Sequence, residues 1–101
     1  MTTVLLTPEA ELDLEEIADY IAADNPRRAV SFVDELRDRC QEIATAPLAH
    51  AERHELGPGI RSCLHGRYLI FFTFDPDDRI VLIVRVLHGA RNLDVIFGNV
   101  Q

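Results

Sequence analysis

Two long apolar runs separated by a short polar turn constrain this chain more than any other feature. Residues 68–74 (Tyr-Leu-Ile-Phe-Phe-Thr-Phe) and residues 80–88 (Ile-Val-Leu-Ile-Val-Arg-Val-Leu-His) are apolar at nearly every position. Between them, residues 75–78 (Asp-Pro-Asp-Asp) have the composition of a turn. The pattern predicts two neighbouring antiparallel strands that are buried on both faces.

Two helix starts precede these strands. Thr7-Pro8 and Asn25-Pro26 each combine an N-capping side chain with proline at the first helical position. Apolar residues then recur at steps of three and four, from Ala10 to Ile21 and from Ala29 to Ile43. The first helix is expected to end near residue 24 and the second near residue 46. Because the connection between them is short, the two helices are expected to form an antiparallel hairpin.

Strands at residues 3–6 and 60–65 complete the expected fold. The element order is β-α-α-β-β-β, which predicts one α+β domain over residues 1–101. In it, a helical hairpin packs on one face of a mostly antiparallel four-stranded sheet. The hairpin can cover only one apolar face. Residues 92–100 must therefore fold back over the other face, or another chain must cover it.

The charge of the chain is unevenly distributed. Residues 1–50 carry eleven acidic residues and four arginines, whereas residues 51–101 carry six of each, and the chain contains no lysine. A net charge of −7 disfavours non-specific nucleic-acid binding, because phosphate contacts need a positive surface. We therefore expect no direct, specific binding of nucleic acid by this chain alone.

Cysteine use and hydropathy predict a cytoplasmic protein. Cys40 and Cys63 form neither a CxxC pair nor a disulfide framework, and we expect two reduced, at least partly buried thiols. No apolar run approaches the roughly 20 residues that span a bilayer, and the first residues lack the pattern of a signal peptide. His50 and His54 are four residues apart, but Pro47 and Gly57 flank them. An exposed connection without metal is expected there, and no cofactor is expected.

Four local motifs follow one another along the chain. They are Leu-Thr-Pro-Glu-Ala at residues 6–10, Asn25-Pro26, Glu-Leu-Gly-Pro-Gly-Ile-Arg at residues 55–61, and a final pair at residues 66–72 and 85–93. The final pair reads Gly-Arg-Tyr-Leu-Ile-Phe-Phe and Arg-Val-Leu-His-Gly-Ala-Arg-Asn-Leu. In this order and spacing they resemble the ParE branch of the RelE/ParE toxin superfamily, from about residue 4 to residue 94.

The resemblance implies the toxin component of a type II toxin–antitoxin system, of the kind also described as plasmid stabilisation proteins. Such a toxin is neutralised by a cognate ParD-like antitoxin, and the ParE branch is known for poisoning DNA gyrase. Two alternatives stay open. The first alternative to gyrase poisoning is a ribosome-dependent mRNA endonuclease of RelE type, and the second is a non-toxic domain that retains only antitoxin binding.

The residues that RelE-like ribonucleases use are largely missing from this sequence. RNA cleavage needs an acid, a base and cations for the phosphate. The family's arginine after the strand tyrosine falls at Leu69, and the region of its C-terminal tyrosine holds Phe97. The loop before the second strand offers no lysine. We therefore assign no catalytic residue and expect an action based on binding.

The candidate residues for contacting the target or the antitoxin are Arg61, Arg67, Arg85, His88 and Arg91. His88 and Arg91 are expected on an exposed rim after the last strand. Arg85 interrupts an apolar strand, so it either pairs internally, with Asp94 as a candidate partner, or lies on the open sheet face. The alternative for Arg61 and Arg67 is that they are ordinary charged residues at strand edges. The alternative for Arg91 is that it clamps the C-terminal tail through an ion pair with Asp94.

Overall fold

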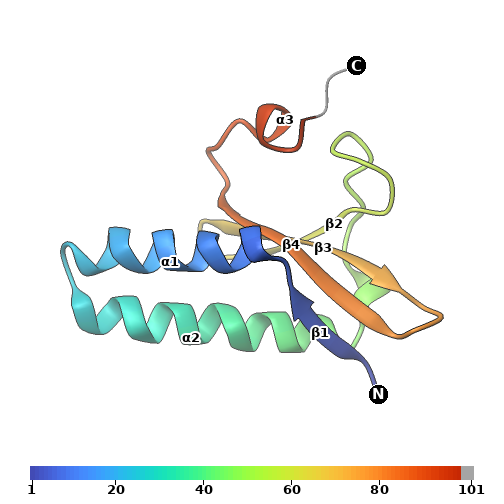
Figure 1. The fold of residues 1–101 in the computed structure, drawn as a ribbon, viewed down its shortest axis with the longest axis horizontal. Helices are drawn as coiled ribbons and strands as arrows, with labels where there is room; N and C mark the ends of the chain where they lie inside the picture. The colour runs from blue at the N-terminus through green and yellow to red at the C-terminus, as the bar shows by residue number, and fades with distance from the viewer. Residues whose placement is uncertain (99–101) are drawn as a thin grey trace.

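A four-stranded sheet with two antiparallel helices across one face makes up most of the molecule (Figure 1). The structure, a computed structural model, describes residues 1–98. The strands are β1 (Thr3–Leu6), β2 (Arg61–His65), β3 (Tyr68–Asp75) and β4 (Ile80–His88). The helices are α1 (Pro8–Ala22), α2 (Pro26–Ile43) and a short α3 (Leu93–Ile96), with a 3₁₀ turn, η1, at Pro47–Ala49. The predicted β-α-α-β-β-β order is confirmed, and α3 is added to it.

The strands lie in the order β1-β4-β3-β2. The β2–β3 and β3–β4 pairs are antiparallel, as their short turns predict. β1 pairs with β4 in parallel, from Thr3 opposite Ile80 to Leu6 opposite Ile83. β1 therefore ends halfway along β4. Beside the second half of β4, residues 84–88, lies helix α1 in place of a strand.

Both long helices are capped as the sequence predicts. The hydroxyl of Thr7 accepts a hydrogen bond from the Ala10 N–H at 3.0 Å and donates one to the Val84 carbonyl at 2.8 Å. The Asn25 side chain accepts a hydrogen bond from the Arg28 N–H at 3.1 Å. A cap of this kind stabilises a helix by about 1 kcal/mol. The Thr7 cap also ties the start of α1 to β4, so it orients the helix on the sheet.

The main core lies between the hairpin and the sheet. α1 contributes Leu14 and α2 contributes Leu36, which are at most 2% exposed. The sheet contributes five side chains that are at most 1% exposed, namely Ile70, Phe72, Val81, Ile83 and Val86. The apolar stripes of the two helices therefore face the sheet, as their three- and four-residue spacing predicts.

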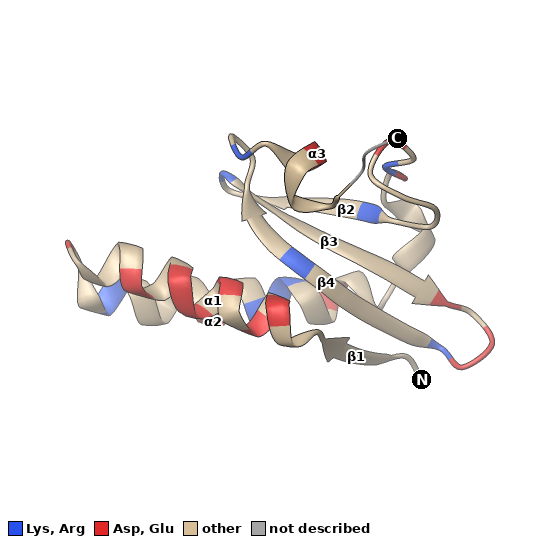
Figure 2. Ribbon diagram, turned by 45° about the horizontal axis from the view of Figure 1, so that its top comes forward, with Lys and Arg blue, Asp and Glu red and all other residues tan. Residues whose placement is uncertain are grey.

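The outer face of the hairpin is polar. Acidic residues recur along α1 (Figure 2), and Glu9, Glu15, Glu16 and Asp19 are exposed. This is the solvated face expected of an amphipathic helix. Among residues 1–98, no helix combines the length and the apolar character that crossing a membrane requires.

The second face of the sheet is covered by this chain itself. Phe71, Leu87 and Leu56 form a second buried cluster, and α3 packs over it. The Phe97 ring meets the Phe71 ring edge-on, with centroids 5.0 Å apart. Of the two predicted covers, the folded-back tail is therefore the one observed, although residues 99 and 100 of that segment lie outside the described part. The connection before β2 contributes Leu56, which the sequence did not indicate.

A buried ion pair holds α1 against the open half of β4. Asp13 is 5% exposed, and its two carboxylate oxygens accept hydrogen bonds from Arg85 Nε and Nη2, each at 2.8 Å. One of these oxygens also accepts the Val86 N–H at 2.9 Å. The hydrogen bonds that Arg85 donates to the Asp13 carboxylate raise the pKa of Arg85 above its ordinary value. Of the two alternatives for Arg85, internal pairing is the one observed, and its partner is Asp13 in place of the candidate Asp94.

A β-bulge creates the position of this pair. Phe71 faces Arg85 across the sheet and Phe72 faces Ile83, so Val84 is an extra residue in β4. The bulge changes the alternation of the strand. Val86 consequently joins the core under the helices and Leu87 joins the opposite cluster.

The two cysteines are reduced and buried, as predicted. Cys40 on α2 is 1% exposed, and Cys63 on β2 is 3% exposed. Burial raises the pKa of the Cys40 thiol to about 11 and also raises the pKa of Cys63. Both thiols are therefore neutral, unreactive members of the core at ordinary pH.

We predict that Asp13→Ala lowers the free energy of unfolding by about 3 kcal/mol, because it leaves a partly buried guanidinium and a buried N–H without an acceptor. Asp13→Asn is expected to cost less, since its amide oxygen can still accept one hydrogen bond. Urea denaturation measures both. Asp19→Ala, at an exposed site of the same helix, is the control. A loss from Asp13→Ala no larger than that from the control would contradict this account.

The buried thiol of Cys40 predicts loss of stability at high pH. Its folded-state pKa of about 11 lies above the ordinary value of 9.0. The neutral-thiol contribution is therefore complete below pH 9 and is lost as the pH rises toward 11, by up to about 2–3 kcal/mol. Urea denaturation from pH 8 to pH 10.5 should show this fall, and Cys40→Ala should show a shallower one from a lower starting stability. Parallel slopes for the two proteins would refute the assignment.

Candidate functional site

Three of the five predicted contact residues meet at one end of the molecule. Arg67 lies in the turn between β2 and β3, His88 ends β4, and Arg91 follows in the connection to α3. A hydrogen bond from the Gly89 N–H to the Arg67 carbonyl, at 2.9 Å, joins the turn to this connection. Figure 2 accordingly shows these two basic segments close together.

The geometry of this end follows from the two-residue turn. Gly66 has a φ of +59°, a left-handed conformation that side chains disfavour, so glycine suits this position. The turn places Tyr68 opposite His88, and their rings meet edge-on with centroids 5.3 Å apart. The His88 Nδ1 atom accepts the Ala90 N–H at 3.1 Å. This bond assigns the proton of a neutral His88 ring to Nε2.

A hollow opens beside these residues, between the sheet, the C-terminal end of α1 and the N-terminal half of α2. Its volume is about 610 Å³. It is lined by aromatic, apolar and basic residues, namely Tyr20, Ile21, Arg28, Phe32, Gly66, Arg67, Tyr68 and His88. A narrower cleft of about 160 Å³ shares Tyr20, Tyr68 and His88 with it and adds Asp13, Glu16 and Arg91. We call the two together the end groove.

The helix side of the end groove was not predicted. Tyr20 and Phe32 fall beside the apolar stripes of their helices, and Tyr20 is 78% exposed. A large aromatic residue off the buried stripe of an amphipathic helix is the signal that could have indicated them. Phe32 contacts Tyr68 with ring centroids 5.5 Å apart, so it links α2 to the turn between β2 and β3.

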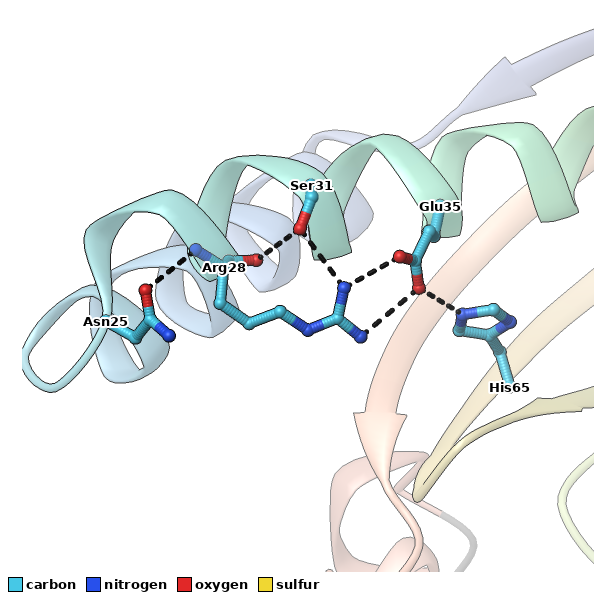
Figure 3. A network of polar contacts seen from close by, with 5 residues as sticks. All are labelled: Asn25, Arg28, Ser31, Glu35 and His65. Atoms are coloured by element: carbon cyan, nitrogen blue, oxygen red, sulfur yellow. Dashed lines mark hydrogen bonds and ion pairs between the residues drawn. The ribbon is translucent and has the colours of Figure 1, made fainter.

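A polar network fixes the α2 wall of the groove (Figure 3). Glu35 accepts hydrogen bonds from Arg28 Nη1 at 2.7 Å and Arg28 Nη2 at 3.4 Å, and its Oε1 lies 3.4 Å from His65 Nε2. The hydrogen bond from Arg28 and, more weakly, that from His65 lower the pKa of Glu35. The Arg28 guanidinium also lies over the Phe32 ring, 5.0 Å from its centroid. Arg28 is thus held in place at the rim.

The other two predicted contact residues lie elsewhere. Arg85 belongs to the pair with Asp13. Arg61 donates a hydrogen bond to the His50 carbonyl at 2.6 Å and lies 3.5 Å from Glu52, so it fastens the connection before β2. Both arginines therefore hold segments of the chain together.

The two histidines of that connection have different surroundings. The His50 ring packs edge-on against Phe72, with centroids 5.7 Å apart, and burial lowers the pKa of His50. His54 is an exposed side chain whose Nδ1 lies 3.7 Å from Glu52. Among residues 1–98, no group of three His, Cys, Asp or Glu side chains could hold a metal ion.

The fold is similar to that found in solved ParDE and RelBE toxin–antitoxin structures. Residues 4–93 match the family described as "ParE toxin of type II toxin-antitoxin system, parDE", and the chain belongs to this family. The resemblance of the sequence motifs to ParE is thereby confirmed. No curated protein matches the sequence.

Three solved structures are similar to this chain. The chromosomal ParDE toxin–antitoxin system of P. aeruginosa matches with a TM-score of 0.75 and 20% identity, over 87% of this chain and 96% of that one. The RelBE2 complex of Mycobacterium tuberculosis matches with a TM-score of 0.62 and 27% identity, over 86% and 96%. The intact E. coli RelBE complex matches with a TM-score of 0.64 and 13% identity, over 90% and 100%.

We predict that Arg91→Ala changes the free energy of unfolding by under about 1 kcal/mol, because its side chain is exposed. Among residues 1–98, Arg91 forms no ion pair with Asp94, so the alternative role as a clamp has no contact to support it. Arg85→Ala, which breaks the pair with Asp13, is the comparison and should destabilise the protein clearly. Thermal and urea unfolding of the two variants measure this. Equal destabilisation by the two substitutions would support the alternative role of Arg91 as a clamp on the C-terminal tail.

Proposed function

We propose that this chain is the toxin of a type II pair, that it acts by binding and poisoning DNA gyrase, and that a ParD-like antitoxin silences it. One observation carries the choice of binding over RNA cleavage. The sheet face opposite the helices is apolar and is closed over by α3. The position of the family's arginine is occupied by Leu69, which belongs to this apolar cluster.

The side chains of that face do not match the acid–base groups and cations that RNA cleavage needs. Phe97 stands where the family's tyrosine would be, and its ring packs on Phe71. A phenyl ring neither donates nor accepts a proton. Arg53 lies 5.8 Å from the centroid of the Phe71 ring, but its guanidinium is paired with Glu55 at 2.7 Å. Within residues 1–98, Phe97 therefore supplies no acid for cleavage through the 2′-hydroxyl, and the nearby Arg53 is already paired with a carboxylate.

The proposed antitoxin partner is supported by the family match and by the similar structures. The similar structures are those of toxin–antitoxin systems, and the family is defined by such pairs. The end groove offers a partner an exposed apolar and cationic surface on a chain with a net charge of −7. A system of this kind works in the cytoplasm, where gyrase, ribosomes and antitoxin are present, and plasmid stabilisation is the role we propose for it.

Purified chain should inhibit supercoiling by gyrase and trap cleaved DNA, while messenger RNA on programmed ribosomes stays intact. His54→Ala should behave as the wild type in both assays, because His54 is exposed and has no assigned acid–base role. Adding the antitoxin should restore supercoiling. Specific messenger cleavage at the same concentrations would establish the ribonuclease alternative. Inactivity in both assays, with antitoxin still bound, would indicate a non-toxic binding domain.

A further inference from the structure

Two arginines at the end groove have no acidic partner of their own. Six of the ten arginines of the chain form ion pairs with carboxylates, at 2.7–3.5 Å. Within residues 1–98, Arg67 and Arg91 form none, and both side chains are exposed. On a chain with seventeen acidic residues, two arginines without a paired carboxylate, on segments joined by the hydrogen bond from the Gly89 N–H to the Arg67 carbonyl, form a local site of positive charge.

An aromatic surface lies between these arginines and the helices. Tyr20 is 78% exposed near the end of α1, and Tyr68 and Phe32 line the same hollow. Exposed tyrosines beside arginines are typical of surfaces that bind proteins, because the rings bury a large area at a low entropic cost. The volume of the hollow, about 610 Å³, falls in the range of pockets that enclose a ligand group.

We propose that the end groove binds an acidic segment of the antitoxin, in which one large apolar or aromatic side chain enters the hollow while carboxylates on either side pair with Arg67 and Arg91. The inference rests on the proposed function, since it names the chemistry of the partner that silences the toxin. The guanidinium groups suit this role because each can hold a carboxylate through two parallel hydrogen bonds. The apolar lining supplies a separate, non-ionic contribution.

The charges around the groove favour a peptide over a nucleic acid. Asp13 and Glu16 line the narrower cleft next to Arg91. A uniformly anionic backbone would place phosphates against these carboxylates as well as against the arginines, on a chain that is already acidic. A peptide can place its acidic residues only where the arginines lie.

Two labelled peptides test the proposal on the full chain. One is a 12-residue peptide with a single phenylalanine flanked by glutamates, and the other carries lysines in place of the glutamates. Fluorescence anisotropy should show the acidic peptide binding at least about tenfold more tightly, with the difference shrinking at high salt. Arg67→Glu and Arg91→Glu should each weaken acidic-peptide binding about tenfold or more, and Tyr20→Ala should weaken binding of both peptides.

Arg79→Glu is the matched control. It makes the same change in net charge in the turn between β3 and β4, and Arg79 forms no ion pair with a carboxylate within residues 1–98. It should alter peptide affinity less than about twofold, because the two arginines of the groove act locally. Melting curves verify that each variant folds. Equal losses from Arg79→Glu and Arg67→Glu would overturn the proposal, as would equal affinity for the two peptides or no saturable binding.

A labelled oligothymidylate of the same length tests whether the groove binds nucleic acid in place of an acidic peptide. Tighter binding of the oligonucleotide than of the acidic peptide, with the same dependence on Arg67 and Arg91, would assign the groove to nucleic acid. The peptide titration does not depend on gyrase. If the chain binds the acidic peptide but does not inhibit supercoiling, the proposed gyrase target is refuted and the proposed peptide site stands. If the chain inhibits supercoiling but does not bind the acidic peptide, only the proposed peptide site is refuted.

Discussion

The pair between Asp13 and Arg85 is the interaction on which the arrangement of helices and sheet depends. β1 covers only the first half of β4, and α1 lies along the second half, where a strand edge would otherwise be open. Asp13 satisfies both the guanidinium and the Val86 N–H at this edge. A buried carboxylate needs such partners, and a strand N–H needs an acceptor. The two requirements meet in one side chain, which sets the position of α1.

The position of α1 in turn defines the end groove. The hairpin runs past the edge of the sheet (Figure 1), so the ends of α1 and α2 stand apart from the turn between β2 and β3. Phe32 bridges part of this space through Tyr68, and the Arg28–Glu35–His65 network holds the wall (Figure 3). The hollow is therefore bounded by rigid elements, a condition that limits the entropic cost of binding.

The two faces of the sheet are covered by different parts of the chain. The hairpin buries one face, and α3 with Leu56 buries the other, so each apolar strand is covered by its own chain. Closing the second face with Phe97 on Phe71 replaces polar chemistry with packing. The binding surface that we propose lies instead at the end of the sheet, where the exposed Arg67 and Arg91 extend from a turn and a connection. Loops on a rigid scaffold are the usual location of such residues.

The sequence by itself determined the element order, both helix caps and the short turns, because hydrophobic period, Thr7-Pro8 and Asn25-Pro26 act over a few residues. It indicated that Arg85 needed a partner, since an unpaired charge is costly in an apolar strand. Only the tertiary structure selected Asp13, which is 72 residues away, over the nearer Asp94. It also brought Tyr20 beside Arg67. Both outcomes depend on a bulge and a helix position that arise from packing over the whole domain, which no local pattern encodes.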